Sequence, residues 1–324
     1  GGLDFAPDGS LIIADTGNHR IRAAAADGAV TTLAGGASGF VDGPGVSARF
    51  QSPADVSVDD QGRIWVADTL NHRVRRIALD GTVSTVLGNG VVTTVDGPIA
   101  TATTAYPQRV DVAPDGTLML AERYVVRRLA LGVVTTLAGG APGYVNDIGA
   151  KAQFDTIGGI VADAAGGVWV ADRENNRLRY VTKHGAVTTQ AGGGKPAFKD
   201  GFGSATRLWH PEGLVAEVGG ALVLADFDNR RLRRIAIPFV ACADGGPCNA
   251  GACDVKTGKC VAKPLKDGAP CATDACLEGE TCQQLSCTGG TKKTCDDGDL
   301  CTADSCKAST GTCSFVAVAA PCDD

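Results

Sequence analysis

Short hydrophobic runs, each about the length of a β-strand and bounded by glycine, aspartate or asparagine, recur along the first three quarters of the chain. Residues 64–88 show the pattern best: a Val/Ile-rich run, a short Asn-containing turn, a basic apolar run, a Gly turn, and a Thr/Val run that ends in Gly. Such runs between turn residues predict strands. One more run just upstream, at residues 54–59, gives each unit four strands.

The unit repeats at a nearly fixed interval. The acidic residues that follow the second strand of successive units are 53, 54, 50 and 54 residues apart, at Asp15, Asp68, Glu122, Asp172 and Asp226. Periods of this length are typical of repeat architectures, and a four-stranded antiparallel sheet repeated around an axis is a propeller blade. The pattern therefore predicts an all-β fold, a β-propeller of four-stranded blades, five of which are present.

The centre of the unit resembles the NHL repeat. The copies stand as ADTGNHRIR (14–22), ADTLNHRVR (67–75), ADRENNRLR (171–179) and ADFDNRRLR (225–233), with a degenerate AERYVVRR at 121–128. The resemblance covers roughly residues 1–240 and implies a propeller that in this family usually has about six blades and more often binds a partner than catalyses a reaction. No fourth strand follows Ile237 and residues 1–6 begin the first unit, so we expect an incomplete, N-terminally truncated ring.

All 13 cysteines lie between Cys242 and Cys322, which predicts a domain boundary near residue 240 and a second region at 241–324. A segment with few large apolar side chains needs disulfides in place of a core, and disulfides persist in oxidising compartments. We therefore expect a secreted or cell-surface protein.

The cysteine spacing repeats. CADGGPCNAGACDVKTGKC and CDDGDLCTADSCKASTGTC resemble the slime-mould CTDC repeat, an extracellular module, and an irregular module lies between them. Four cysteines allow three connectivities, and we expect the pairs Cys242–Cys253, Cys248–Cys260, Cys295–Cys306 and Cys301–Cys313. The final APCDD copies the opening of a module, so we expect Cys322 to pair with a cysteine beyond residue 324.

Metal binding is not expected in this region. Zinc sites use closer cysteine pairs with histidine nearby, which this region lacks. Calcium takes clustered carboxylates, and Asp296, Asp297 and Asp299 offer them as an alternative to a polar turn. We therefore expect no cofactor.

An acidic and a basic residue recur five positions apart at the centre of four units. Antiparallel strands place such residues opposite each other, so we interpret them as ion pairs that fix the hairpin register: Asp15/Arg20, Asp68/Arg73, Asp172/Arg177 and Asp226/Arg231. In the third unit Glu122 replaces Asp and Val125 stands in place of Arg, which indicates that both partners changed together. We interpret Asn18, Asn71, Asn175 and Asn229 as left-handed turn residues, and Trp65 and Trp169 as core.

Long connections join the units, for example at residues 35–53 and 192–211. They share one face of a propeller with the turns between second and third strands, and long loops usually carry function. The candidate binding residues on this face are Phe40, Asp42, Asp96, Tyr144, Asp147, Phe198, Asp200, Trp209 and His210. Alternatively, the aromatic residues fill gaps between blades.

No catalytic arrangement is evident. The chain lacks a nucleophile elbow, a P-loop and a dinucleotide fingerprint, and we interpret His210 as a packing or rim residue. The alternative function is a lactonase-like hydrolase or lyase with a metal in the central channel, for which Asp4, Asp55 and Asp111 are the candidate ligands. Convergence of these acids on one point would favour the enzyme, whereas dispersal or pairing with Arg109 would favour binding.

Charge and hydropathy narrow the partners. The net charge of −6 and the dispersed arginines argue against nucleic acid, and no run approaches the roughly 20 apolar residues of a membrane span. The sequence favours an extracellular binding protein rather than an enzyme. Its propeller would bind a protein or a glycan, and its cysteine-rich modules would form a stalk.

Overall fold

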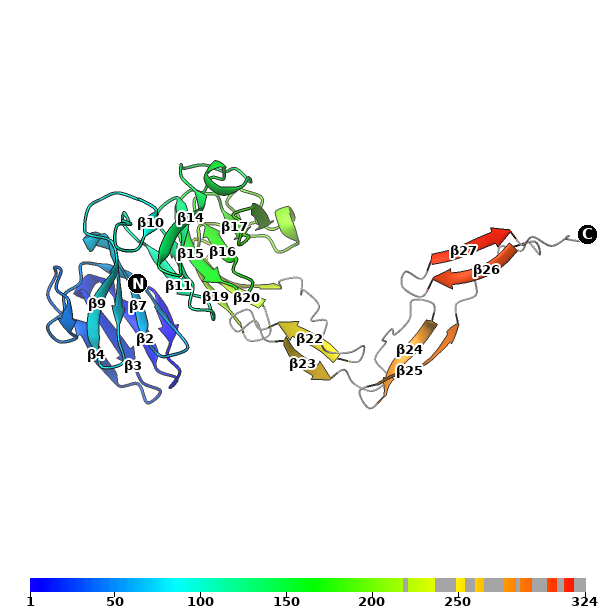
Figure 1. Ribbon diagram of the computed structural model, residues 1–324, viewed down its shortest axis with the longest axis horizontal. Helices are drawn as coiled ribbons and strands as arrows, with labels where there is room; N and C mark the ends of the chain where they lie inside the picture. The colour runs from blue at the N-terminus through cyan, green and yellow to red at the C-terminus, as the bar shows by residue number, and fades with distance from the viewer. Residues whose placement is uncertain are drawn as a thin grey trace, which may run out of the picture. The chain divides into compact units, whose positions relative to one another are not determined.

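The computed structural model describes residues 1–217 and 221–236, together with the backbone of six strands in the cysteine-rich region (Figure 1). The chain divides into two compact units. The first comprises Gly1–Ile237 with Val255–Gly258, and the second comprises Pro238–Asp254 with Lys259–Asp324.

The first unit is an all-β propeller of five antiparallel sheets, which confirms the predicted fold class. Consecutive strands pair as neighbours from the innermost strand outwards, and in blades two and three a two-residue strand from the preceding connection pairs with the outermost strand. Blade one comprises β1 (Leu3–Phe5), β2 (Leu11–Asp15), β3 (Arg20–Ala24) and β4 (Val30–Gly35), and blade two comprises β5 (Gly43–Pro44), β6 (Pro53–Val58), β7 (Ile64–Asp68), β8 (Arg73–Ile77) and β9 (Thr82–Leu87). Blade three comprises β10 (Gly97–Pro98), β11 (Arg109–Val112), β12 (Leu118–Ala121), β13 (Val125–Ala130) and β14 (Val133–Gly139), and blade four comprises β15 (Ile157–Ala162), β16 (Val168–Asp172), β17 (Arg177–Val181) and β18 (Val187–Ala191). Blade five comprises β19 (Pro211–Ala216), β20 (Ala221–Asp226) and β21 (Arg231–Ala236). Short 3-10 turns are η1 (Thr16–Asn18), η2 (Thr69–Asn71), η3 (Gly149–Lys151) and η4 (Gly203–Ala205).

The core lies between neighbouring blades. Phe50, at the end of the connection into blade two, is fully buried against Ile12 of blade one and Val66 of blade two. Phe154 is buried in the same way before blade four. Trp65 and Trp169 are 8% and 6% exposed, which confirms that they are core residues. Burying a large apolar side chain stabilises the fold by about 1.5–3 kcal/mol, so each blade depends on its neighbours.

Blade five has three strands within the described residues. The expected absence of a fourth strand after Ile237 concerns residues outside the described ones. Strand β1 pairs with β2, so the first residues belong to blade one. Leu232 on β21 is 76% exposed, whereas its counterparts Val74 and Leu178 are fully buried. The described part of blade five therefore leaves one apolar side uncovered.

The second unit contains three hairpins: β22 (Asn249–Cys253) with β23 (Cys260–Pro264), β24 (Leu277–Gln283) with β25 (Ser286–Lys292), and β26 (Thr302–Lys307) with β27 (Thr312–Ala317). The backbone register places two cysteines opposite each other in every hairpin: Cys253 and Cys260, Cys282 and Cys287, and Cys306 and Cys313. The expected disulfides, the pairing of Cys322 and the calcium alternative at Asp296, Asp297 and Asp299 depend on atoms outside the described residues.

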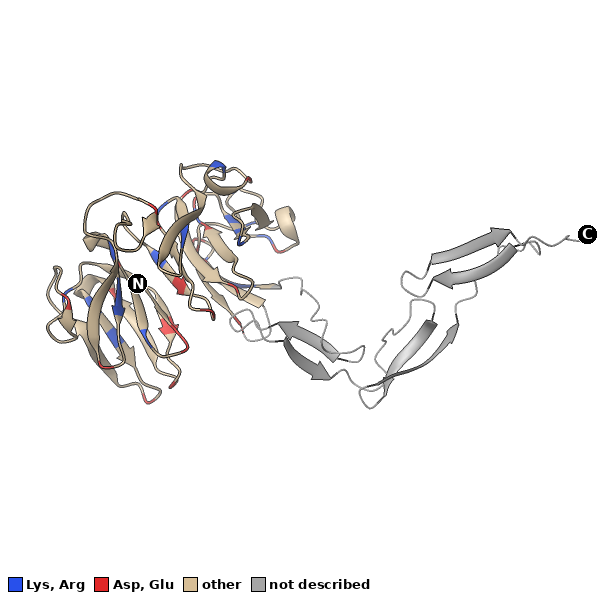
Figure 2. Ribbon diagram, viewed as in Figure 1, with Lys and Arg blue, Asp and Glu red and all other residues tan. Residues whose placement is uncertain are grey.

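Charged residues of both signs are spread over all the blades (Figure 2), so the described propeller presents no single basic strip of the kind that follows a nucleic-acid backbone. In the part of the chain that the structure describes, no helix has the length and apolar character needed to cross a membrane.

Candidate functional site

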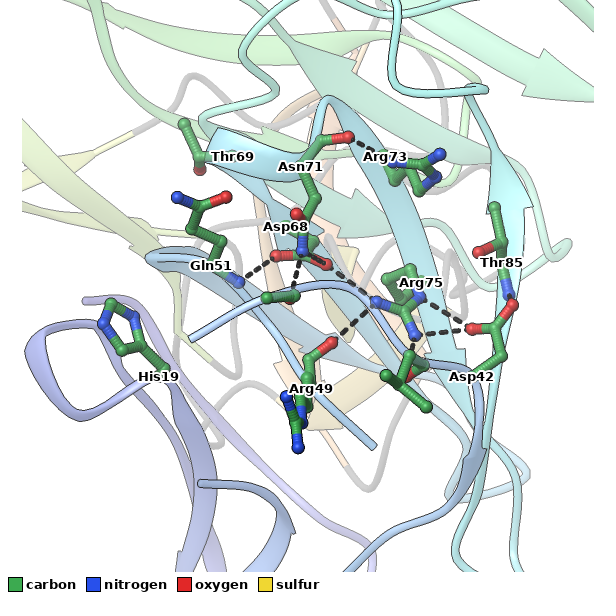
Figure 3. Close-up of polar contacts among 12 residues, drawn as sticks. His19, Asp42, Arg49, Gln51, Asp68, Thr69, Asn71, Arg73, Arg75 and Thr85 are labelled. Atoms are coloured by element: carbon green, nitrogen blue, oxygen red, sulfur yellow. Dashed lines mark hydrogen bonds and ion pairs between the residues drawn. The ribbon is translucent and has the colours of Figure 1, made fainter. Parts of the chain in front are cut away.

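A buried arginine fastens the long connection to the blade that follows it (Figure 3). In blade two, Arg75 Nη1 donates to Asp68 Oδ2 at 2.8 Å, and Nη2 donates to Asp42 Oδ1 at 2.5 Å. Two carbonyl oxygens of the connection accept further hydrogen bonds from this fully buried guanidinium. Asp42 also accepts the backbone N–H of Thr85. We call this arrangement of arginine and two acids the latch; it ties the connection to β8 and β9.

The observed ion pairs differ from the predicted ones, because each acid binds the arginine seven residues later rather than the arginine five residues later. The register does place Asp68 opposite Arg73. However, Arg73 points to the rim, where its guanidinium carbon lies 3.7 Å from the ring centre of Phe40 and its N–H groups reach backbone carbonyls. The observed pairs are Asp15–Arg22, Asp68–Arg75, Asp172–Arg179 and Asp226–Arg233. The predicted pairs Asp15/Arg20, Asp68/Arg73, Asp172/Arg177 and Asp226/Arg231 are wrong.

Blade three keeps the latch, although the sequence indicated its loss. Arg127 Nη1 donates to Glu122 Oε1 at 2.9 Å, and Nη2 donates to Asp96 Oδ1 at 2.7 Å. Five residues rather than seven separate the acid from its arginine because the turn is shorter. Val125 does stand at the register position of Arg20, since both lie opposite the glycine that ends the fourth strand. The inference that both partners of the pair changed together is wrong, because Glu122 binds Arg127.

Most of the predicted rim residues hold the connections in place. The aromatic rings lie 3.7, 3.6 and 3.9 Å from guanidinium carbons, in the pairs Phe40–Arg73, Tyr144–Arg177 and Phe198–Arg231. The acids Asp42, Asp96 and Asp200 bind latch arginines. In blade four Asn146 takes this place, and Asp147 accepts the N–H of its neighbour Ile148. Six of the nine candidates thus have a structural role that explains their recurrence. The three aromatic residues stack on arginines and stay partly exposed, which differs from the gap-filling between blades considered from the sequence.

The turn after the second strand also joins neighbouring blades. Its left-handed residue is the one that follows the predicted asparagine, namely His19, His72, Asn176 or Arg230. The asparagine itself donates to the strand-end acid, as Asn71 does to Asp68 at 2.8 Å. The Nδ1 atom of His72 accepts the backbone N–H of Tyr106 at 3.2 Å, and His19 does the same for Ser52 at 3.1 Å. These histidines therefore connect blade one to two and blade two to three.

The three candidate channel acids do not converge on one point. Each accepts a backbone N–H of the next blade: Asp4 from Val58 at 2.8 Å, Asp55 from Val110 at 3.1 Å, and Asp111 from Ala162 at 2.7 Å. Across residues 1–217 and 221–236, no three His, Cys, Asp or Glu side chains come together in a way that could hold a metal. This dispersal argues against a metal ion held jointly by Asp4, Asp55 and Asp111.

A cavity of about 480 Å³ lies where the five inner strands begin, and we call it the channel mouth. One ring of equivalent positions lines it: Gly2, Asp55, Arg109, Gly159 and Gly213. Burial raises the pKa of Asp55 to about 7, against the opposing effect of the Arg109 guanidinium. Because Asp55 keeps part of its surface exposed, water moderates this shift.

Charged residues also gather where blade four meets blade five. His210 Nδ1 lies 2.5 Å from Asp228 Oδ2, and Nε2 lies 3.2 Å from Glu174 Oε2. Arg173 bonds Glu174 through Nη1 and donates from Nε to Glu212 Oε1 at 2.8 Å. We call these five residues the junction network. Glu212 also lines the channel mouth, so the network and the cavity form one continuous polar site.

The repeat does not need charge at this junction. Thr16 and Thr69 occupy the position of Arg173, and their hydroxyls donate to the carbonyl oxygens of Pro53 and Pro107 at 2.7 Å. In earlier blades, the position equivalent to Glu174 is occupied by Gly17 or Leu70. The position equivalent to His210 is occupied by Ser52, Tyr106 or Thr156, and the position equivalent to Glu212 by Ala54, Gln108 or Gly158. Neutral residues thus suffice to join blade one to two and blade two to three, whereas blade three has Arg123 after its acid.

The sequence predicted only part of this site. Trp209, which is 40% exposed, and His210 were candidates, whereas Arg173, Glu174, Glu212 and Asp228 were missed. These residues differ in type from those at the equivalent positions of other repeats, and this difference could have identified them from the sequence.

Comparisons with known proteins agree with the fold. The NHL repeat profile matches residues 50–77, and the Dictyostelium (slime mold) repeat profile matches 241–265 and 294–318. Protein SUPPRESSOR OF QUENCHING 1, chloroplastic, from Arabidopsis thaliana is 30% identical over 254 residues, which cover 69% of this chain and 24% of the relative. Protein psiQ from Dictyostelium discoideum is 39% identical over 80 residues, which cover 23% of this chain and 8% of the relative. The chain therefore spans only a small part of either relative.

A solved structure shares the propeller. An auxiliary nutrient binding protein from Bacteroides ovatus aligns with a TM-score of 0.56 and 16% identity, over 72% of this chain and 58% of the other. At this identity the likeness shows the fold alone.

Proposed function

We propose that this chain, an NHL-repeat β-propeller followed by slime-mould-type repeats, binds a glycan at the channel mouth and the junction network. The observation that carries the proposal is the departure of the blade four–five junction from the repeat. Charged residues stand there at positions where neutral residues join blade one to two and blade two to three.

The chemistry of the site suits a sugar. Sugar hydroxyls both donate and accept hydrogen bonds, and the side chains of Arg173, Glu212 and His210 offer partners of both kinds. The exposed ring of Trp209 lies next to His210 and can stack on the C–H face of a sugar. The volume of about 480 Å³ falls within the range of small-molecule sites. A protein is the other ligand that the sequence suggested, and the test below distinguishes the two.

The latches support recognition by holding the loops still. A preorganised surface loses less conformational entropy on binding, and the connections into blades two to five are each tied to a buried arginine. The latch residues therefore serve the site indirectly.

We place the protein outside the cell or on its surface, with the cysteine-rich region as a stalk. The support is compositional: the 13 cysteines of residues 242–322 need an oxidising compartment to form disulfides.

A glycan array probed with the full chain tests the proposal. We expect binding to a defined set of glycans that falls by about tenfold or more in Trp209→Ala and Glu212→Ala, since each loses a stack or hydrogen bonds. Phe202→Ala is the matched control, because Phe202 is 95% exposed in the same connection and lies outside the site. The absence of glycan binding, or equal binding by all three variants, would contradict the proposal. Capture of a protein that depends on Trp209 would replace the glycan with a protein ligand.

A further inference from the structure

We infer that the channel mouth selects a glycan that carries a carboxylate, as a uronic acid does, and that Arg109 binds this carboxylate. The inference rests on the proposed glycan binding and adds the class of sugar. It follows from the geometry of Arg109, from the glycines around it and from the charges that face the cavity.

Arg109 is held so that part of its guanidinium remains available. Nε donates to the carbonyl oxygen of Gly158 on blade four at 2.5 Å, and Nη1 donates to the carbonyl of Gln108 at 3.2 Å. Nη2 has no hydrogen-bond partner within the residues that the structure describes. Neither oxygen that Arg109 contacts carries a full charge, so its positive charge is not neutralised by direct pairing. A guanidinium in this state suits a planar carboxylate.

Three of the five ring positions, Gly2, Gly159 and Gly213, carry no side chain. At Gly2 and Gly159 neighbouring atoms occupy the place of a side chain, because a Cβ atom would lie 1.5 Å from Asp55 Oδ1 and 2.3 Å from the carbonyl oxygen of Glu212. At Gly213 the space is open, since a Cβ would meet only Ala225, at 3.7 Å. Asp55 and Arg109 therefore supply the charge of the ring.

Few charges compete with the ligand. Glu212 lines the cavity, but it is paired with Arg173. The groups that face Asp55 are Arg109 and Asp111 on β11, and the Glu212–Arg173 pair stands at the same mouth.

Asp55 makes the site sensitive to pH. An ionised Asp55 would repel the ligand carboxylate, whereas a protonated Asp55 would not. Because burial raises the pKa of Asp55 to about 7, the neutral form dominates below that pH. The affinity for an acidic sugar should therefore fall as the pH rises through about 7.

Calorimetric titration with galacturonate and galactose tests the inference, because the two sugars differ only at C6, which is a carboxylate in one and a hydroxymethyl in the other. At pH 6 we expect galacturonate to bind about tenfold tighter or more, as for a charged hydrogen bond. Arg109→Gln should abolish this preference. Asp55→Asn should keep it and remove its fall between pH 6 and 8. Asp60→Asn, at an exposed position on the same blade, should behave as the wild type.

Three results would overturn the inference: equal affinity for the two sugars, a preference that survives in Arg109→Gln, or selective binding of a peptide C-terminal carboxylate in place of galacturonate. Binding of neutral glycans that depends on Trp209 and Glu212 would overturn the inference alone and leave the proposed function standing. Failure of every glycan to bind would overturn both.

Discussion

Replacing Arg75 by alanine tests whether the latch stabilises the propeller. Arg75 and Asp68 are both fully buried, so the variant leaves Asp68 without its cation. Burial already raises the pKa of Asp68, although hydrogen bonds from Asn71, Gln51 and Arg75 oppose the shift. Removing one partner of a buried ion pair costs about 3–5 kcal/mol. At about 2–4 °C per kcal/mol for a domain of this size, Tm should fall by about 6–20 °C.

The first blade provides the matched control. Arg22 pairs with Asp15 at 3.5 Å, and their side chains are 37% and 22% exposed. Exposed pairs contribute about 0–1 kcal/mol, so Arg22→Ala should change the free energy of unfolding little. Urea unfolding followed by tryptophan fluorescence measures both variants, with Trp65 as a reporter in blade two. Arg75→Lys should recover little stability, since an ammonium cannot replace the planar fork. Equal costs for Arg75→Ala and Arg22→Ala would refute the reasoning.

Two further predictions concern the inter-blade histidine and the cysteines. Burial and the charge of Arg73 lower the pKa of His72 in the folded protein. The contribution of neutral His72 to stability is therefore complete above the unfolded-state pKa of about 6.5. This contribution is lost as the pH falls through the lower folded-state pKa. His72→Asn, which copies Asn176, should flatten this acid dependence in thermal melts at pH 5 to 8, and an unchanged profile would contradict the prediction. In the second unit, peptide mapping should find Cys242–Cys253, Cys248–Cys260, Cys295–Cys306 and Cys301–Cys313, each worth about 2–5 kcal/mol. A bond between Cys253 and Cys260, which are opposite in the backbone register, would be evidence against this connectivity.

The propeller could be predicted from the sequence because its determinants are local and repeated. Strand-length apolar runs separated by glycine turns recur at nearly the same interval in every unit, and the structure follows them strand for strand.

The ion pairs could not be assigned in this way, because they depend on contacts from a distant connection. Alternation along β8 places Arg73 and Arg75 on the same face, and either can reach Asp68 in principle. Phe40 stacks on Arg73 at the rim, and Asp42 binds Arg75 below it. Both partners come from a loop more than thirty positions away, and the strand pattern alone holds no information about where that loop lies.

The same reasoning explains why the candidate site escaped a search for catalytic motifs. Arg173, Glu174, Glu212 and Asp228 belong to two blades, and no short spacing connects them. They become conspicuous only when each position is compared with its equivalents, where threonine, glycine, leucine and alanine already join the blades without charge. Buried and partly buried charges are costly unless they are paired. Because neutral residues can join neighbouring blades, four charged residues at one junction give the fold no structural advantage. Their position beside the channel mouth, which Arg109 also lines, is therefore better explained by a ligand than by the assembly of the blades.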